Sequence, residues 1–209
     1  MATINIKQIE KQIELKNICK SFDNKIVLSN INLTFNSNEI YCIMGHSGRG
    51  KTTLVNIIAG LVKPDEGTIV GIENKRLSIV FQEDRLLNWE TALNNVLFVT
   101  KKAVAPTLNK KSVMPLALQL LIEAGLGDSI NKKAAQLSGG MRRRVCVCRA
   151  LIAEYDLLIL DEPFKGLDGD IKLTMMDMVK KQNINNKFII CITHDPSEAE
   201  YLGGKLILL

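Results

Sequence analysis

Apolar and polar side chains alternate along two early segments of the chain, residues 13–19 and 27–35. Both segments are predicted to be half-buried strands, because successive side chains of a strand point to opposite faces. Residues 39–44 form a mostly apolar run that ends at a glycine-rich loop. After this loop the period changes, and apolar residues at 54, 55, 57, 58, 61 and 62 share one face of a helix. The pattern therefore predicts three strands and then a helix that residues 64–67 end.

The rest of the chain alternates between predicted strands and helices. Short strands are expected at 68–72 and 78–81, and later strands at 157–160, 188–193 and 205–209. Residues 83–136 are mostly helical, with the clearest helices at 91–100 and 113–124 and a basic loop at 101–111. Further helices are expected after residue 140 and at 171–181. This order predicts an α/β fold with a mainly parallel sheet and an inserted helical lobe.

Composition and length fit one such domain. Hydrophobic residues make up 46% of the 209 residues and aromatic residues only 5%, which suits an aliphatic-rich α/β protein. No stretch approaches the roughly 18 apolar residues that a membrane helix needs, and the N-terminus lacks an apolar signal core. We therefore expect a soluble, cytoplasmic chain in which residues 1–11 form a polar extension.

The cysteines and the net charge do not point to a particular function. The five cysteines are scattered and lack a Cys-x-x-Cys pair, so we expect buried reduced thiols rather than zinc or a disulfide framework. They are Cys19, Cys42, Cys146, Cys148 and Cys191. The net charge of +5 is compatible with an anionic membrane surface or nucleic acid but selects neither.

The glycine-rich loop has the pattern of a P-loop, with a strand before it and a helix after it. The candidate nucleotide-binding residues are Gly45, His46, Ser47, Gly48, Arg49, Gly50, Lys51, Thr52 and Thr53. Glycines let backbone N–H groups surround phosphate oxygens at the positive end of the following helix. Lys51 is expected to contact the β- and γ-phosphates, and the Thr52 hydroxyl to bind Mg²⁺. The alternative is a chance match in a glycine-containing loop.

Two carboxylates end the apolar strand at 157–160. An acidic pair there would be costly without a cation, and ligands bind at the carboxyl ends of strands in open parallel sheets. Asp161 is therefore the candidate to anchor Mg²⁺, and Glu162 the candidate to polarise the attacking water. An ordinary pair of loop carboxylates is the alternative.

Gln82 and His194 each follow an apolar strand. Either could reach a γ-phosphate or a water if its strand neighbours the strand before the P-loop. Taken alone, each fits an ordinary polar residue at a strand end better.

The motifs together resemble those of the ATP-binding subunits of ABC transporters, over nearly the full length of the chain. The matching segments are Walker A at 45–52, the Q-loop Gln82, the signature at 137–141, Walker B at 157–161 followed by Glu162, the D-loop at 166–168 and the switch histidine His194. The resemblance implies a P-loop NTPase core at 13–82 and 137–209 with an antiparallel β subdomain and a helical lobe at 83–136. It also implies ATP and Mg²⁺ as cofactors, with Gln82 as a further Mg²⁺ ligand.

Phe22 falls where this family has an aromatic residue that stacks on adenine, although alone it fits a core residue nearly as well. The resemblance further implies that the signature residues Ser138, Gly139 and Gly140 of one subunit cap the ATP held by Walker A of another. Their position at a helix N-terminus suits that role, because it offers a hydroxyl, N–H groups and a positive dipole. The active species is then a dimer, with an identical or a related second ATPase subunit.

The Q-loop sequence at 81–89 resembles that of importers for nitrate, sulfonates or taurine. In such subunits this stretch meets the coupling helix of a membrane permease, which makes Arg85, Leu86, Leu87 and Trp89 contact candidates. Leu87 and Trp89 fit packing of the helical lobe equally well. The resemblance also implies a solute-binding protein in the system and a location at the inner face of the cell membrane. Arg144 and Lys165 stand where the family pattern leads us to expect other residues.

Other readings of the ATPase remain open. An exporter subunit is the nearest alternative, because the permease largely sets the direction of transport. Soluble cassette proteins that act on DNA or ribosomes usually carry two cassettes, coiled-coil insertions or zinc modules, and the sequence has none, so we expect no nucleic acid partner. A nucleotide-binding protein with little hydrolysis is disfavoured because Glu162, Gln82 and His194 are all present.

Overall fold

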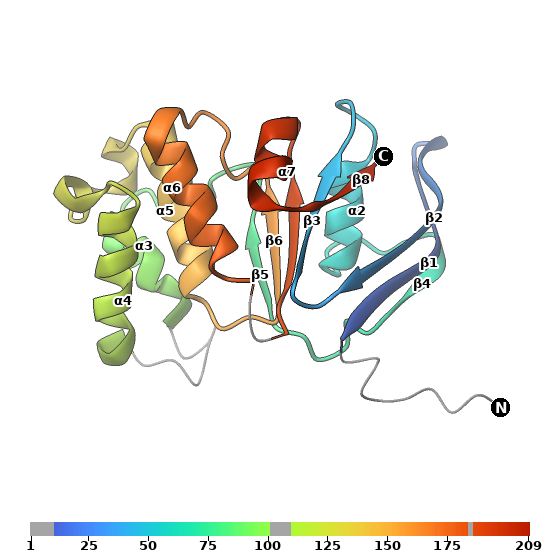
Figure 1. Cartoon of the computed structure of the whole chain (residues 1–209), viewed down its shortest axis with the longest axis horizontal. Coiled ribbons are helices and arrows are strands. Elements are labelled where there is room, and N and C mark those ends of the chain that lie inside the picture. The colour runs from blue at the N-terminus through green and yellow to red at the C-terminus, as the bar shows by residue number, and fades with distance from the viewer. Residues whose placement is uncertain (1–10, 101–109, 184–185) are drawn as a thin grey trace.

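The computed structural model describes residues 11–100, 110–183 and 186–209, and its central sheet is parallel throughout. The strand order in this sheet is β5-β6-β7-β3-β8. Its strands are β3 (Glu39–Met44), β5 (Leu77–Val80), β6 (Leu157–Asp161), β7 (Phe188–Ile192) and β8 (Lys205–Leu208). The predicted parallel sheet is therefore confirmed, and Figure 1 shows it standing in the middle of the molecule.

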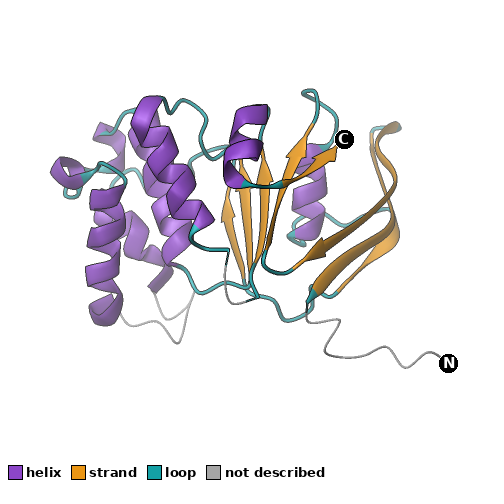
Figure 2. Cartoon of the chain, viewed as in Figure 1, coloured by secondary structure: helices purple, strands orange, loops and turns teal. Residues whose placement is uncertain are grey.

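A second, antiparallel sheet lies to one side of the first (Figures 1 and 2). It contains β1 (Gln12–Phe22) between β2 (Lys25–Asn36) and β4 (Glu66–Val70). Strands β1 and β2 are longer than the sequence predicted. The β1–β2 pairing shifts register between Leu15 and Ile18 and again before Lys20 and Ser21, and these irregularities interrupt the alternation on which the prediction depended. The predicted antiparallel subdomain is nevertheless present.

Helix α2 (Lys51–Ile58) lies between the two sheets and is shorter than predicted. Gly60 adopts φ +71°, its N–H donates to Ile57 O at 3.0 Å, and the N–H of Leu61 donates to Asn56 O at 2.8 Å. This is the hydrogen-bond pattern with which a glycine ends a helix. The expectation that the helix extends to residue 62 is therefore wrong, and Leu61 is instead 56% exposed.

The remaining helices lie on the other side of the central sheet (Figure 2). They are α3 (Ala92–Leu97) followed by a 3-10 turn (Phe98–Thr100), α4 (Lys110–Glu123), α5 (Gly139–Ile152), α6 (Gly169–Lys180) and α7 (Pro196–Leu202). Short 3-10 turns also occur at Gly127–Ser129 and Ala134–Gln136. The sequence did not predict α7. Most of the predicted polar extension and of the predicted basic loop at 101–111 lies outside the described residues.

The central strands separate two apolar cores. Alternate residues such as Cys42 and Leu158 pack toward α3, α4, α5 and α6, whereas Tyr41 and Leu157 pack toward α2 and β1. Both faces of β6 and β7 are buried along their whole length. This explains why these strands appear in the sequence as continuous apolar runs rather than as alternating ones.

Four of the five cysteines are buried, and only Cys19 is half-buried. The prediction of buried thiols is therefore wrong for Cys19, which lies where the register of β1 shifts. Burial raises the pKa of both Cys146 and Cys148 to about 12, so these two thiols stay protonated near neutral pH.

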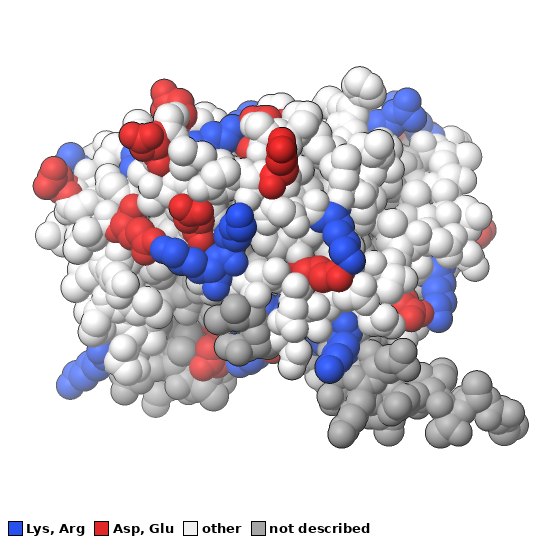
Figure 3. Space-filling view, in the orientation of Figure 1, with Lys and Arg blue, Asp and Glu red and all other residues white. Residues whose placement is uncertain are grey.

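The surface carries charges of both signs. Figure 3 shows acidic and basic side chains interspersed on the visible face, without a single broad patch of one sign. Among the helices of the described ranges, none is long and apolar enough to cross a bilayer.

Candidate nucleotide-binding and catalytic site

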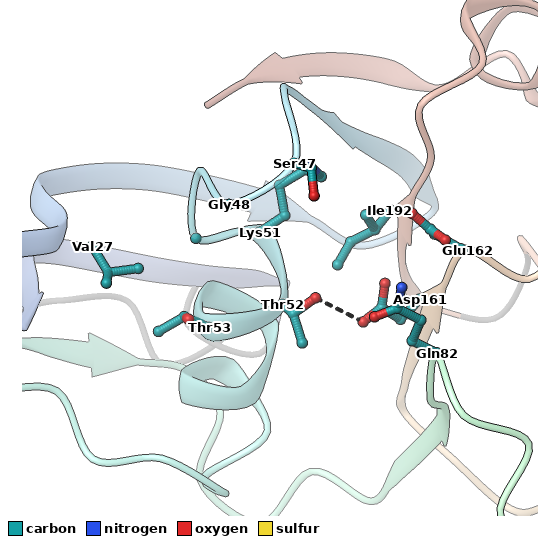
Figure 4. Close-up of a pocket in the computed structure, with 11 residues that line it drawn as sticks. Val27, Ser47, Gly48, Lys51, Thr52, Thr53, Gln82, Asp161, Glu162 and Ile192 are labelled. Carbon is teal, nitrogen blue, oxygen red and sulfur yellow. Dashed lines mark hydrogen bonds between the residues drawn. The ribbon is translucent and has the colours of Figure 1, made fainter. Parts of the chain in front are cut away.

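A pocket of about 310 Å³ opens where β3, β5 and β6 end and α2 begins (Figure 4). Its walls come from segments that are far apart in the sequence. The lining residues are Val27, Ser47, Gly48, Gly50, Lys51, Thr52, Thr53, Gln82, Asp161, Glu162 and Ile192. The fold thus brings most of the predicted P-loop, the two carboxylates and Gln82 together. Val27 and Ile192 were not predicted, and Gly45, His46 and Arg49 lie in the same loop without lining the pocket.

The P-loop connects β3 to α2 in a conformation that depends on Gly50. This residue caps α2 with φ +85°, and a Cβ placed on it would lie 2.9 Å from Val27 O. Both the backbone conformation and the close approach therefore require glycine. Lys51 lies across the loop, where its Nζ donates to Gly45 O at 2.7 Å and to His46 O at 2.9 Å.

Thr52 and Asp161 face each other across the pocket. The Thr52 hydroxyl donates to Oδ2 of Asp161 at 3.0 Å, as the dashed line in Figure 4 shows. Asp161 is 4% exposed, and this burial raises the pKa of its carboxyl; the charge of Glu162 acts in the same direction, and the hydrogen bond from Thr52 opposes both. A buried carboxylate with a hydroxyl beside it is a fitting pair of oxygen ligands for Mg²⁺.

Gln82 adds a side-chain carbonyl beside Asp161 in Figure 4. No cluster of three or more His, Cys, Asp or Glu side chains suited to a metal occurs within the described ranges. A cation at Thr52 and Asp161 would therefore complete its shell with nucleotide oxygens and water, as Mg²⁺ usually does.

Glu162 is held at the pocket rim by its backbone and by a cation. It adopts φ +48°, and its N–H donates to Ile192 O at 3.0 Å. Nζ of Lys165 donates to Oε2 of Glu162 at 2.9 Å. Burial favours a higher pKa for Glu162, but the hydrogen bond and charge of Lys165, together with His194 and Lys51, outweigh it, so the pKa lies below its usual value. The carboxylate is thus ionised at neutral pH, and the contribution of Lys165 was not predicted.

The two strand-end residues reach the site by different routes. His194 follows β7, which neighbours β3, so it meets the condition set by the sequence. Its side chain is 66% exposed and does not line the pocket, but Nδ1 lies 3.7 Å from Oε1 of Glu162. Gln82 follows β5, which β6 and β7 separate from β3, so the condition fails. Gln82 lines the pocket nevertheless.

The signature residues lie outside this pocket. Ser138 caps α5, and its Oγ accepts a hydrogen bond from the N–H of Met141 at 3.2 Å. Ser138 and Gly139 are exposed, and a Cβ on Gly139 would meet nothing within 4 Å. A single chain therefore does not place these residues over its own P-loop.

Phe22 lies at the end of β1 and is 46% exposed, so the alternative of a core residue is wrong. Nζ of Lys20 lies 5.2 Å from the centre of its ring. Phe22 does not line the pocket.

In the loop after Gln82, some of the predicted permease contacts are buried and others are exposed. Leu86 is only 9% exposed and packs in the core beside α3, so its prediction as a contact residue is wrong. Trp89 is 69% exposed, so the alternative that it packs the helical lobe is wrong as well. The Arg85 guanidinium stacks 3.8 Å from the centre of the Phe81 ring.

Comparison with known proteins identifies the family. A profile described as ABC transporter matches residues 28–165, which run from β2 past Walker B. The chain belongs to the ABC transporter family. The predicted resemblance is therefore confirmed.

Three members of the ABC transporter family are similar to this chain over most of its length. The aliphatic sulfonates import ATP-binding protein SsuB of Corynebacterium glutamicum is 38% identical over 100% of this chain and 83% of its own length. The bicarbonate transport ATP-binding protein CmpD of Synechocystis sp. is 38% identical over 88% of this chain and 67% of its own. The taurine import ATP-binding protein TauB of Escherichia coli O157:H7 is 37% identical over 94% of this chain and 79% of its own.

Two solved structures of the cassette MJ0796 share the fold of this ABC transporter subunit. One is described as the dimeric structure of a bacterial ABC transporter cassette, with a TM-score of 0.83 and 32% identity over 94% of each chain. The other is a dimer in a post-hydrolysis state bound to ADP and Pi, with a TM-score of 0.82 and 31% identity over 94% of each chain. The predicted ABC ATPase fold and ATPase activity are confirmed.

Proposed function

We propose that this ABC ATPase drives solute import through a separate permease, in a system for a small solute that carries an anionic group, of the sulfonate, taurine or bicarbonate kind. The relatives named above support this direction and solute class. The observation that carries the chemistry is the meeting of Lys51, Thr52, Asp161 and Glu162 in one pocket. An exporter is the alternative that the experiments below can detect.

The catalytic step would use the carboxylates in two roles. Thr52, Asp161 and Gln82 would hold Mg²⁺, whose charge would offset the charge that develops on the phosphate oxygens. Lys51 and the loop N–H groups bind the β- and γ-phosphates once Lys51 leaves the carbonyls of Gly45 and His46. Glu162, ionised and fixed by its backbone, orients and polarises the attacking water.

His194 would bind the γ-phosphate or the attacking water from a position next to Glu162. Its Nδ1 already lies within reach of Oε1, so a γ-phosphate between the P-loop and this ring would meet both side chains. The exposed position of His194 leaves it free to approach the nucleotide when a second subunit closes the site.

Dimerisation would complete the nucleotide site. The exposed Ser138 and Gly139 and the half-buried Gly140 at the start of α5 supply N–H groups and a positive helix end to the ATP of a second subunit. Phe22, exposed at the end of β1, would stack on the adenine. We expect closure on ATP and opening after hydrolysis, with an identical or a related partner chain.

The permease would dock on the loop after Gln82, in the helical lobe at 83–136. Trp89 offers the largest exposed apolar side chain there, and Arg85 and Leu87 lie beside it in the sequence. Aromatic and Arg residues dominate the energetics of protein interfaces. This docking would place the subunit at the inner face of the cell membrane, with a solute-binding protein delivering the cargo to the permease.

The catalytic assignment is tested by two substitutions with different expected effects. Glu162→Gln should reduce ATP turnover by roughly 10²–10⁴-fold while ATP binding persists, and it should favour an ATP-held dimer. Lys51→Ala should weaken ATP binding itself, because it removes a contact used before the transition state. Steady-state hydrolysis that is unchanged in Glu162→Gln would refute the role of this carboxylate.

The transport assignment is tested by photo-cross-linking from position 87 or 89 in native membranes. Capture of a multi-span permease encoded with a solute-binding protein supports import, and capture of a permease without one supports export. Capture of a ribosomal or DNA-bound protein would refute the transport assignment but not the ATPase assignment.

A further inference from the structure

Three arginines of helix α5, Arg142, Arg143 and Arg149, contact the loop after β5. These contacts are distinct from the nucleotide contacts described above. Arg143 has a side chain that is only 5% exposed. Its Nη1 donates to Phe81 O at 2.6 Å, and its Nη2 donates to Gln82 O at 2.8 Å and to Asp161 O at 3.4 Å. One guanidinium therefore joins the backbone of the Q-loop to the backbone at the end of Walker B.

The neighbouring contacts hold the same loop from the same helix. Nη1 of Arg143 lies 3.6 Å from Oδ1 of Asp84, and Nε of Arg142 lies 3.3 Å from its Oδ2. Farther along α5, Arg149 donates to Arg85 O at 2.9 Å and to Asp84 O at 3.3 Å. Sγ of Cys146 donates to the same Asp84 carbonyl at 2.7 Å.

The far end of the loop is fixed to α3 by a buried amide. Asn95, which is 0% exposed, accepts a hydrogen bond from the Leu87 N–H at 2.8 Å and donates to Leu87 O at 3.1 Å. The residues from 81 to 87 are thus tied to α5 and α3 and have little freedom to move on their own.

We propose that Arg143 is a positioning residue for ATP hydrolysis, which sets Gln82 against Asp161 in the pocket and ties both to the signature helix. The inference rests on the proposed role of Gln82 as a ligand. A guanidinium suits this task because its planar fork of five donors can bond several acceptors in fixed directions. Burial of the Arg143 side chain fixes those directions further, since the guanidinium cannot turn to water instead.

Through the same contacts, we expect α5 to couple the loop that docks the permease to the nucleotide site. Its first turn carries Ser138, Gly139 and Gly140, and its next turn carries Arg143. A displacement of the loop at 82–89, where we place the permease, is passed through Arg143 to the helix end that caps a second subunit's ATP. The Arg143 side chain also passes this displacement to the residues proposed to hold Mg²⁺, because it donates to Asp161 O.

The test is a double-mutant cycle on the full chain, read as ATP hydrolysis with kcat and KM separated. Arg143→Lys keeps the charge but loses the fork, and we expect kcat to fall by about 10- to 100-fold with KM nearly unchanged, as misplacement of a positioned group does. In a Gln82→Ala background the same change should cost less than about twofold, because the group that it positions is already gone.

Arg144→Lys is the matched control. Arg144 is the next residue on α5, and its Nη1 donates to the carbonyls of Ala124 at 2.6 Å and Gly125 at 3.1 Å, away from the Q-loop. Its Nε also donates to Gly140 O at 3.3 Å within α5, a bond that a lysine amine can replace. The control should leave kcat near that of the unsubstituted protein, and circular dichroism should show all variants folded at the assay temperature. An equal loss of kcat in Arg144→Lys, or a full loss from Arg143→Lys on top of an impaired Gln82→Ala, would overturn the inference alone. An unimpaired Gln82→Ala would overturn both the inference and the proposed role of Gln82.

Discussion

Replacing Asp161 by asparagine should stabilise the nucleotide-free fold while abolishing hydrolysis. Asp161 is buried, its side chain accepts a hydrogen bond from the Thr52 hydroxyl, and the carboxylate of Glu162 follows it directly. The charges of Arg143 and Lys51 lower the pKa of Asp161 only partly, because Arg143 donates to backbone carbonyls and Lys51 to two loop carbonyls rather than to this carboxylate. Without Mg²⁺ and nucleotide, the negative charge of Asp161 is therefore poorly compensated.

The magnitude follows from two opposing contributions. Burying an uncompensated charge costs several kcal/mol in a real protein, and the hydrogen bond from Thr52 to that charge returns about 1.5–3 kcal/mol. The asparagine amide keeps an oxygen for Thr52 and removes the charge, so Asp161→Asn should raise the free energy of unfolding by about 1–2 kcal/mol. For a chain of this size the melting temperature then rises by roughly 2–8 °C. The assay is thermal unfolding at neutral pH with EDTA and no nucleotide.

The pH dependence gives an independent check on the sign. Since burial raises the folded-state pKa of Asp161, the native state binds more protons than the unfolded state between the usual Asp pKa and the raised one. The unsubstituted protein should gain stability from this group as the pH falls through that window, and Asp161→Asn should lack this gain.

Asp156→Asn provides a control of opposite sign. The backbone N–H of Arg76 donates to Asp156 at 2.8 Å and its Nη2 at 3.2 Å, and a hydrogen bond from the Arg76 side chain is the main cause that lowers the pKa of this carboxyl. This control should lose stability at neutral pH. If Asp161→Asn also proves less stable than the unsubstituted protein in EDTA, the argument from uncompensated charge is wrong.

Three further predictions concern single sites. Lys165→Ala should move the acid limb of the kcat–pH profile to higher pH, because removal of the cation at 2.9 Å lets the pKa of Glu162 rise; a profile that coincides with that of the unsubstituted enzyme would contradict the prediction. Gly60→Ala should lower the free energy of unfolding by about 1 kcal/mol through backbone strain alone, since φ is +71° and a Cβ there would meet nothing within 4 Å; calorimetry checks this, and an unchanged melting temperature would count against it. Leu121→Ala, at a fully buried position of α4, should cost about 2–5 kcal/mol in urea unfolding, and a cost below about 1 kcal/mol would show that α4 packs loosely.

The sequence predicted strands β6 and β7 well because they are buried on both faces. Strands β6 and β7 are apolar along their whole length, so their type and position are visible without any knowledge of their neighbours. The P-loop and Asp161 were predicted for a similar reason. Their chemistry requires particular residues in one short segment, next to a strand that is itself easy to recognise.

Local signals that compete with periodicity account for the errors in helix length. Leu61 and Val62 continue the apolar spacing of α2, but Gly60 ends the helix before them. Helix α7 was missed although Asp195 accepts a hydrogen bond from the N–H of Ser197 and Pro196 occupies the first helical position. These cap signals were present in the sequence, and the helix was too short for an apolar period to show.

Contacts between distant residues could not be predicted. Arg143 and Gln82 are 61 positions apart, and their hydrogen bond depends on how α5 packs against β5. The same holds for the strand order, which separates β5 from β3 and yet brings Gln82 to the pocket. Neither periodicity nor motif spacing carries that information.

The two-sided burial of the central strands limits how this protein can change in length. Strands β3, β6 and β7 each supply one core with their odd-numbered side chains and the other core with their even-numbered ones. A single residue inserted into β6 would therefore exchange the two sets, sending every following side chain to the core that it was not shaped to fill. Insertions and deletions are consequently confined to the connections between strands, while the spacing within each of these strands stays constant.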